Sequence, residues 1–130
     1  MAREDLKDRI GVIEESYEFM LGYAAQGLSG DRQAPAGSQL RDYLKRSDTA
    51  LTGLSQVFTA LAEQEKSETV EQHCAFAAVL ERDARDAQTV IRLVLAQPSI
   101  SSQLVDNLNA SIHLRALLTD LFLIAEILKL

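Results

Sequence analysis

The chain has 130 residues, of which 25% are charged and 47% hydrophobic, and its formal net charge is −6. This size and composition are those of an ordinary globular protein that can bury a hydrophobic core without disulfides or bound metal. The negative charge disfavours non-specific binding to nucleic acid and docking on anionic membranes, since both depend on basic side chains. The single cysteine, Cys74, excludes an internal disulfide and a multi-cysteine zinc site.

Aromatic residues are few, with four Phe, three Tyr and no Trp. A core built from Leu, Ile, Val and Ala suits helices better than sheets. The first ten residues are charged from Arg3 onward, so we expect no secretory signal and a cytoplasmic location. We expect one domain that spans residues 1–130.

The first predicted helix covers residues 2–28. Its apolar positions recur at alternating steps of four and three, which is the spacing of one helical face. They are Leu6, Ile10, Ile13, Tyr17, Met20 and Ala24. The segment from Ser29 to Gly37 follows, and its two glycines, proline and small polar residues predict a loop.

The second predicted helix covers residues 38–65, with Ser38 as its N-cap. Its stripe is the most regular in the chain and consists of Leu40, Leu44, Ser47, Leu51, Leu54, Phe58 and Leu61. The stripe ends before Glu65, so we expect a turn between Gln64 and Thr69. Because no Gly or Pro marks that turn, one continuous helix of about 60 residues stays open as an alternative.

The third predicted helix covers residues 68–97 and ends before Pro98. Its stripe is Val70, His73, Ala77, Leu80, Ala84, Ala87, Ile91 and Val94. The fourth covers residues 100–130, with the stripe Ile100, Leu104, Asn107, Ser111, Leu114, Leu118, Leu121, Ala125 and Leu128. Four amphipathic helices with short connections predict an all-α fold, an antiparallel up-down four-helix bundle.

Polar residues interrupt these stripes at about the same height of the predicted bundle. They are Tyr17, Ser47, Asn107 and Ser111. One interpretation is a buried hydrogen-bond network that fixes the register of the helices. The other is a small polar pocket that binds a ligand.

His73 lies on a stripe beside Cys74, and the antiparallel arrangement places it near acidic residues of the first two helices. This makes His73 a weak candidate for a metal ligand. Neighbouring residues on a helix point about 100° apart and do not easily share one ion. The Glu-x-x-His pattern of diiron bundles is missing, since Val70 and Ala110 stand three residues before the two histidines. We therefore predict no metal and no cofactor.

A histidine phosphotransfer role is a further alternative. The stretch from Ser111 to Leu118, which contains His113, resembles the H-box of histidine-kinase dimerisation domains. It departs from that pattern because it lacks an acidic residue directly after the histidine and a proline further on. His73 in turn lacks the downstream Lys-Gly that is typical of phosphotransfer domains.

The C-terminal helix carries more apolar surface than one bundle can cover. Thirteen of the nineteen residues from Ile112 to Leu130 are apolar, whereas a helix in a small bundle buries a face of a little over 100°. Arg115, Asp120 and Glu126 interrupt the stretch, so we do not expect a transmembrane helix. The excess predicts a surface for a homodimer or a protein partner, made of Leu117, Leu123, Ile124, Ile127 and Leu130.

No nucleophile, base and orienting group converge in the sequence, and no glycine-rich phosphate loop is present. We therefore predict no catalytic residues and a non-catalytic interaction or regulatory module, acting as a homo-oligomer or partner-binding adaptor. A ligand- or metal-binding bundle that uses the polar positions or His73 is the alternative, and phosphotransfer is the third.

Overall fold

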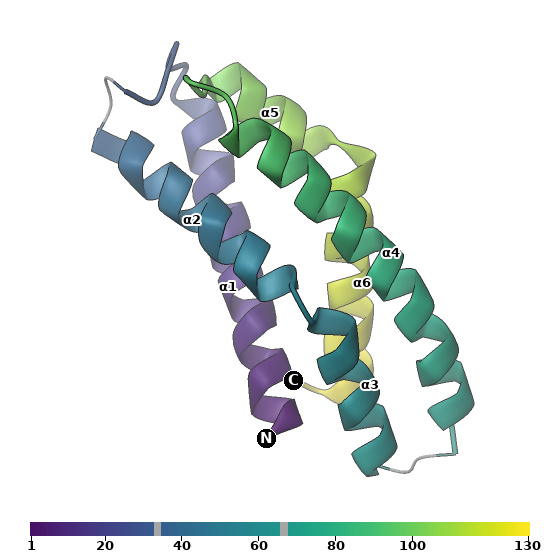
Figure 1. The fold of residues 1–130 in the computed structure, drawn as a ribbon. Coiled ribbons are helices and arrows are strands. Elements are labelled where there is room, and N and C mark those ends of the chain that lie inside the picture. Colours follow the sequence, from purple (N-terminus) through teal and green to yellow (C-terminus); the bar gives the residue numbers. More distant parts are fainter. Residues whose placement is uncertain (33–34, 66–67) are drawn as a thin grey trace.

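The computed structural model describes residues 1–32, 35–65 and 68–130, and within these ranges it contains six α-helices and no strand (Figure 1). The helices are α1 (Ala2–Ala25), α2 (Pro35–Leu51), α3 (Leu54–Glu65), α4 (Val70–Leu95), α5 (Ser102–Ala110) and α6 (Ile112–Leu128). The prediction of an all-α fold is confirmed. The predicted count of four helices is wrong, because the second and fourth predicted helices are each divided in two.

The first division falls at Gly53, between α2 and α3. Gly53 has a φ of 81°, in the left-handed region that a residue without a side chain adopts at no steric cost. This conformation ends the hydrogen-bond ladder of α2 and lets α3 start in a new direction. The side chain of Arg9 donates hydrogen bonds to the carbonyls of Ala50 and Thr52, which are left open where α2 ends.

The second division falls at Ser111, between α5 and α6. Ser111 has an extended backbone (φ −63°, ψ 144°), and its hydroxyl accepts a hydrogen bond from the backbone N–H of Leu114. It is therefore the N-cap of α6, a position that serine favours because the side chain replaces a missing backbone acceptor. The apolar stripe predicted to run unbroken through residues 100–130 changes direction here.

Helices α3 and α4 pack against each other in antiparallel orientation (Figure 1). Because α3 ends at Glu65 and α4 begins at Val70, the alternative of one continuous helix is wrong. The turn predicted between Gln64 and Thr69 falls partly on residues 66–67, which lie outside the described residues.

The buried residues follow the predicted stripes closely in α2, α3 and α4. All seven positions predicted for residues 38–65 are buried, and so are Leu80, Ala84, Ala87, Ile91 and Val94 of α4. In α1 the stripe departs from the prediction after Ile13, where Ser16 and Tyr23 are buried in place of Tyr17 and Ala24. α1 packs against α2, α3 and α5, so its buried face follows the positions of three neighbours.

Helix α4 packs against α2, α3, α5 and α6 and so connects the helices before it to the helices after it. The two termini lie close together at one end of the molecule (Figure 1). Arg3 connects them, since its guanidinium donates to the carbonyls of Leu128 and Lys129 where α6 ends. A cation at a helix C-terminus is favoured by the partial negative charge of the open carbonyls.

A second polar connection closes the opposite end, where the chain returns from α1 into α2. Asp31 is buried, and its carboxylate accepts from the Arg41 guanidinium at 2.5 Å and from the Ile100 N–H at 2.6 Å. Arg41 also donates to the carbonyls of Leu95 and Gln97 at the end of α4. The hydrogen bond from Arg41 lowers the pKa of Asp31 below its usual range, so the carboxylate stays charged and paired.

Candidate functional site: an apolar groove between α4 and α6

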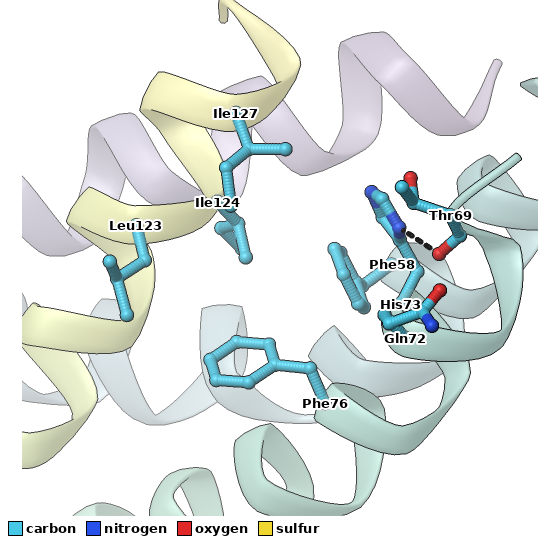
Figure 2. Close-up of a pocket in the computed structure, with 8 residues that line it drawn as sticks. All are labelled: Phe58, Thr69, Gln72, His73, Phe76, Leu123, Ile124 and Ile127. Atoms are coloured by element: carbon cyan, nitrogen blue, oxygen red, sulfur yellow. Dashed lines mark hydrogen bonds between the residues drawn. The ribbon is translucent and has the colours of Figure 1, made fainter. Parts of the chain in front are cut away.

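An apolar groove of about 330 Å3 lies where α6 passes the end of α3 and the beginning of α4 (Figure 2). Its lining consists of Phe58, Thr69, Gln72, His73, Phe76, Leu123, Ile124 and Ile127, and we call this set the apolar groove. The three α6 side chains face the aromatic side chains across the open space (Figure 2). Its volume is at the lower end of the range typical of small-molecule pockets.

Three aromatic rings form the inner wall of the apolar groove. The Phe58 and His73 rings are stacked with centroids 5.8 Å apart, and Phe76 meets Phe58 edge-on at 6.2 Å. Stacked and edge-on arrangements are both favoured by the electrostatic quadrupoles of aromatic rings. The wall is therefore pre-formed by α3 and α4 and does not depend on a ligand.

The histidine in this wall has one committed nitrogen and one open nitrogen. His73 Nδ1 lies 2.7 Å from the Thr69 carbonyl oxygen. A carbonyl can only accept, so Nδ1 carries the hydrogen and the neutral ring presents Nε2 as an acceptor. Within the described part of the chain Nε2 forms no hydrogen bond, so it can accept one from a bound molecule.

Two of the five residues predicted for the interaction surface are not exposed. Leu117 and Ile124 are buried, which corrects their assignment to an exposed surface. Both side chains belong to the hydrophobic core, and Ile124 lies at the groove beside Phe58 of α3 and Phe76 of α4.

The other three residues remain accessible. Leu123 is 49% exposed and Ile127 is 61% exposed, both at the rim of the apolar groove, and Leu130 is half-buried. The structure adds Phe122, at 57% exposed, beside them. Phe122 lies seven residues after Arg115 and four before Glu126, which puts it in the polar stripe of the helix. An aromatic residue in a polar stripe is the feature of the sequence that could have predicted its exposure.

No hydrogen bond in the described part of the chain joins any two of the four polar positions predicted to form a ligand pocket. Asn107 is exposed and accepts a hydrogen bond from Gln103, whereas Ser47 is buried on α2. Ser111 is the N-cap of α6, and Tyr17 is only half-buried. Asn107 therefore cannot line a buried pocket with Ser47. In α5, Asn109 is buried instead of Asn107, and its side chain donates to the Met20 carbonyl.

The two histidines and the cysteine lie near helix starts. His73 is half-buried in the first turn of α4, Cys74 is exposed, and His113 is exposed as the second residue of α6. In residues 1–32, 35–65 and 68–130 no three His, Cys, Asp or Glu side chains are grouped as metal ligands would be. Neither histidine occupies the exposed mid-helix position that the phosphotransfer alternative requires.

One carboxyl group is buried where α4 and α6 meet. Asp120 of α6 is only 6% exposed, and its Oδ2 has no hydrogen-bond partner. Burial, and then the neighbouring Asp83 carboxyl, raise the pKa of Asp120 to about 7.

Among the helices that the structure describes, none has both the length and the apolar character needed to cross a bilayer. No protein-family model, curated protein or solved structure is similar enough to this chain to count as a match.

Proposed function

We propose that the chain is a non-catalytic interaction module that associates with a second copy of itself through the outer face of α6. The exposed Leu123 and Ile127 carry this proposal, because both line the apolar groove and so form one apolar surface with it. Exposed apolar side chains that gather at a groove are typical of a binding surface, whereas isolated ones are ordinary. A two-fold dimer is the commonest way to cover such a surface.

Covering this surface supplies a part of the free energy that a dimer needs. Burying an exposed Leu or Ile side chain contributes about 1 to 2 kcal/mol. A two-fold contact buries each side chain twice, so Leu123 and Ile127 together contribute roughly 4 to 8 kcal/mol before the costs of association. The groove also offers a recess into which a side chain of the second copy can insert.

Sedimentation equilibrium of the full chain at about 1 to 100 µM tests this proposal. We expect a reversible dimer, and we expect the double variant Leu123→Glu/Ile127→Glu to weaken association at least roughly a hundredfold. The matched control is Leu93→Glu, because Leu93 is 63% exposed but lies about 25 Å further along α4 than Phe76. A chain that stays monomeric at the highest concentration contradicts the proposal.

A second candidate is the binding of a small apolar molecule in the same groove. The Nε2 atom of His73 favours it, because this atom adds a hydrogen-bond acceptor to a recess whose lining is mostly apolar. The matching ligand class is an alkylated aromatic with one hydroxyl group, which donates to Nε2.

Titration calorimetry with 4-ethylphenol and with ethylbenzene distinguishes this candidate from plain apolar contact. His73→Phe keeps a ring against Phe58 and removes the acceptor. We expect it to weaken binding of the phenol about tenfold, in line with one lost hydrogen bond, and to leave ethylbenzene unchanged. Equal effects on both compounds contradict a role for Nε2.

A further inference from the structure

A second groove lies where α4 passes the break between α2 and α3. It has a volume of about 590 Å3, which is within the range typical of ligand pockets. Its lining includes Thr52, Gly53, Gln56, Arg85, Gln88 and Arg92, and we call it the polar groove. Among the described residues no side chain of α6 lines it, so the polar groove is separate from the apolar groove and from the proposed dimer surface.

Two arginines of the polar groove are each held by a carboxylate through one nitrogen. Arg85 Nε donates to a Glu81 oxygen at 2.5 Å, and Arg92 Nε donates to an Asp48 oxygen at 3.0 Å. In the part of the chain that the structure describes, the Nη atoms of neither arginine form a hydrogen bond. Each guanidinium therefore keeps the N–H groups of two nitrogens for another acceptor. The two side chains are 74% and 60% exposed, so a ligand can reach them.

The carboxylates that hold the two arginines are themselves fixed. Glu81 accepts from Ser55 with one oxygen and from Arg85 with the other. The Ser55 hydrogen bond, followed by that of Arg85, lowers the pKa of Glu81, so the carboxylate stays charged and keeps its hold. Asp48 accepts from the Gln88 amide as well as from its arginine. Both guanidinium groups are thus positioned before any ligand binds, which lowers the entropy cost of binding.

The spacing of the two arginines sets the length of a matching ligand. Arg85 and Arg92 are seven residues apart on α4, so they share one face and lie about 10 Å apart along its axis. Glu81, which binds the first, precedes it by four residues. Asp48, which binds the second, is also bound by Gln88, four residues before it. Both guanidinium groups are therefore drawn about one turn toward the start of α4, and their spacing is kept.

We propose that the polar groove binds an extended small molecule with two anionic groups about 10 Å apart, one on the Nη atoms of each arginine. Guanidinium groups donate in pairs to carboxylate and to phosphate alike, so both kinds of anion match. Gln88, which lies between the two arginines on α4, is already hydrogen-bonded to Thr52 and Asp48. The part of the ligand that links its two anionic groups therefore needs no polar atom.

Nitrogen-15 NMR of the arginine side chains tests this proposal by titration of the full chain at low salt, where charges are weakly screened. Nonanedioate, whose carboxylates lie about 10 Å apart when extended, should bind about tenfold more tightly than pentanedioate or nonanoate, each of which reaches one arginine only. A linear bisphosphate of similar length is titrated in parallel. Tighter binding of either dianion supports the site and identifies the anion. Equal affinities for the three carboxylates, or no binding of either dianion, overturn the proposal.

Arg85→Gln and Arg92→Gln each remove one of the two binding groups. We expect each to weaken nonanedioate about tenfold and to abolish its advantage over nonanoate. The matched control is Arg82→Gln, which removes the same charge from an exposed position of α4 outside the groove lining. It should change the affinity by less than about twofold. Equal weakening by Arg82→Gln and Arg85→Gln is a general effect of net charge and overturns the proposal, and the length series in the unmodified chain does not depend on how the variants fold.

Discussion

Two aspartates at different places in the molecule are equally buried and have opposite surroundings. Asp31 and Asp120 are each 6% exposed. Asp31 accepts hydrogen bonds from Arg41 and from the Ile100 N–H, and its pKa is lowered. Asp120 faces a second carboxyl group, keeps an oxygen without a partner, and has a raised pKa.

This difference separates a part of the molecule that is fixed from a part that can respond. At the Asp31 end, charges and donors match, so the loop, α2 and the end of α4 are held in one arrangement. At the Asp120 site, burial and the neighbouring Asp83 carboxyl disfavour the charged form of Asp120 and raise its pKa to about 7. The apolar groove and the exposed face of α6 adjoin the second site, and natural proteins tend to place unfavourable interactions where function requires them.

The largest effect is expected from removing the favourable aspartate. Asp31→Ala leaves Arg41 without its partner and the Ile100 N–H without its acceptor, and we expect the free energy of unfolding at pH 7 to fall by about 3 to 4 kcal/mol. Urea denaturation measures this loss. Asp42→Ala, at an exposed position one residue from Arg41, should change stability by less than about 0.5 kcal/mol. Similar values for both variants would remove the distinction between the two ends.

Gly37→Ala tests how tightly the Asp31 end is packed. A Cβ atom on Gly37 would lie 1.8 Å from the backbone oxygen of Asp31, so the backbone must shift to accept it. We expect a loss of about 2 to 3 kcal/mol, as for other overpacked sites. Gly22→Ala is the control, because its Cβ meets nothing within 4 Å on an exposed helical surface. It should stabilise the chain by about 0.5 to 1 kcal/mol.

Asp120→Asn should have the opposite sign at the other end. The folded chain binds the Asp120 proton more tightly than the unfolded chain, so stability is highest below the unfolded pKa of about 4 and is lost as pH rises through about 7. At pH 8 we expect the variant to be more stable by about 2 kcal/mol, and at pH 4 to show no gain. Asp31 contributes in the reverse sense, with stability present above about pH 4 and lost in acid. Thermal unfolding across pH 3.5 to 8.5 measures both slopes.

The smallest effect on stability is expected on the outer face of α6. Leu123→Ser removes an exposed side chain, and the free energy of unfolding of the monomer should change by less than about 0.5 kcal/mol. Leu121→Ser, two residues earlier on the buried side, should cost about 3 to 5 kcal/mol. Denaturation at low protein concentration compares the two. A large loss from Leu123→Ser would show that the outer face belongs to the core of the chain.

The spacing of apolar residues predicted the buried face of a helix well where that spacing was regular. Leu40 to Leu61 are spaced at four and three residues, and every member of that stripe is buried. The two divisions were missed although their residue types are visible, Gly53 as a left-handed residue and Ser111 as an N-cap. Both types also occur inside helices, so their identity did not decide the conformation.

The candidate site was predicted in part. The apolar excess of the last helix pointed to Leu123 and Ile127, which are exposed at the groove, but also to Leu117 and Ile124, which are buried. Residue type and position on a helical wheel cannot tell the buried pair from the exposed pair, because each consists of a leucine and an isoleucine on one broad apolar face. The position of α4 separates them, and that position depends on contacts between residues about 40 positions apart.

The sequence by itself therefore determined that this protein is all-α, where its main apolar faces lie, and that its last helix is unusually apolar. These properties follow from side-chain spacing within a few turns. Only the tertiary structure decided which part of α6 is covered, that Phe58, His73 and Phe76 form one wall, and that Asp120 meets Asp83. Burial and electrostatic pairing are properties of surfaces brought together from distant segments, and helical periodicity carries no information about which surfaces those are.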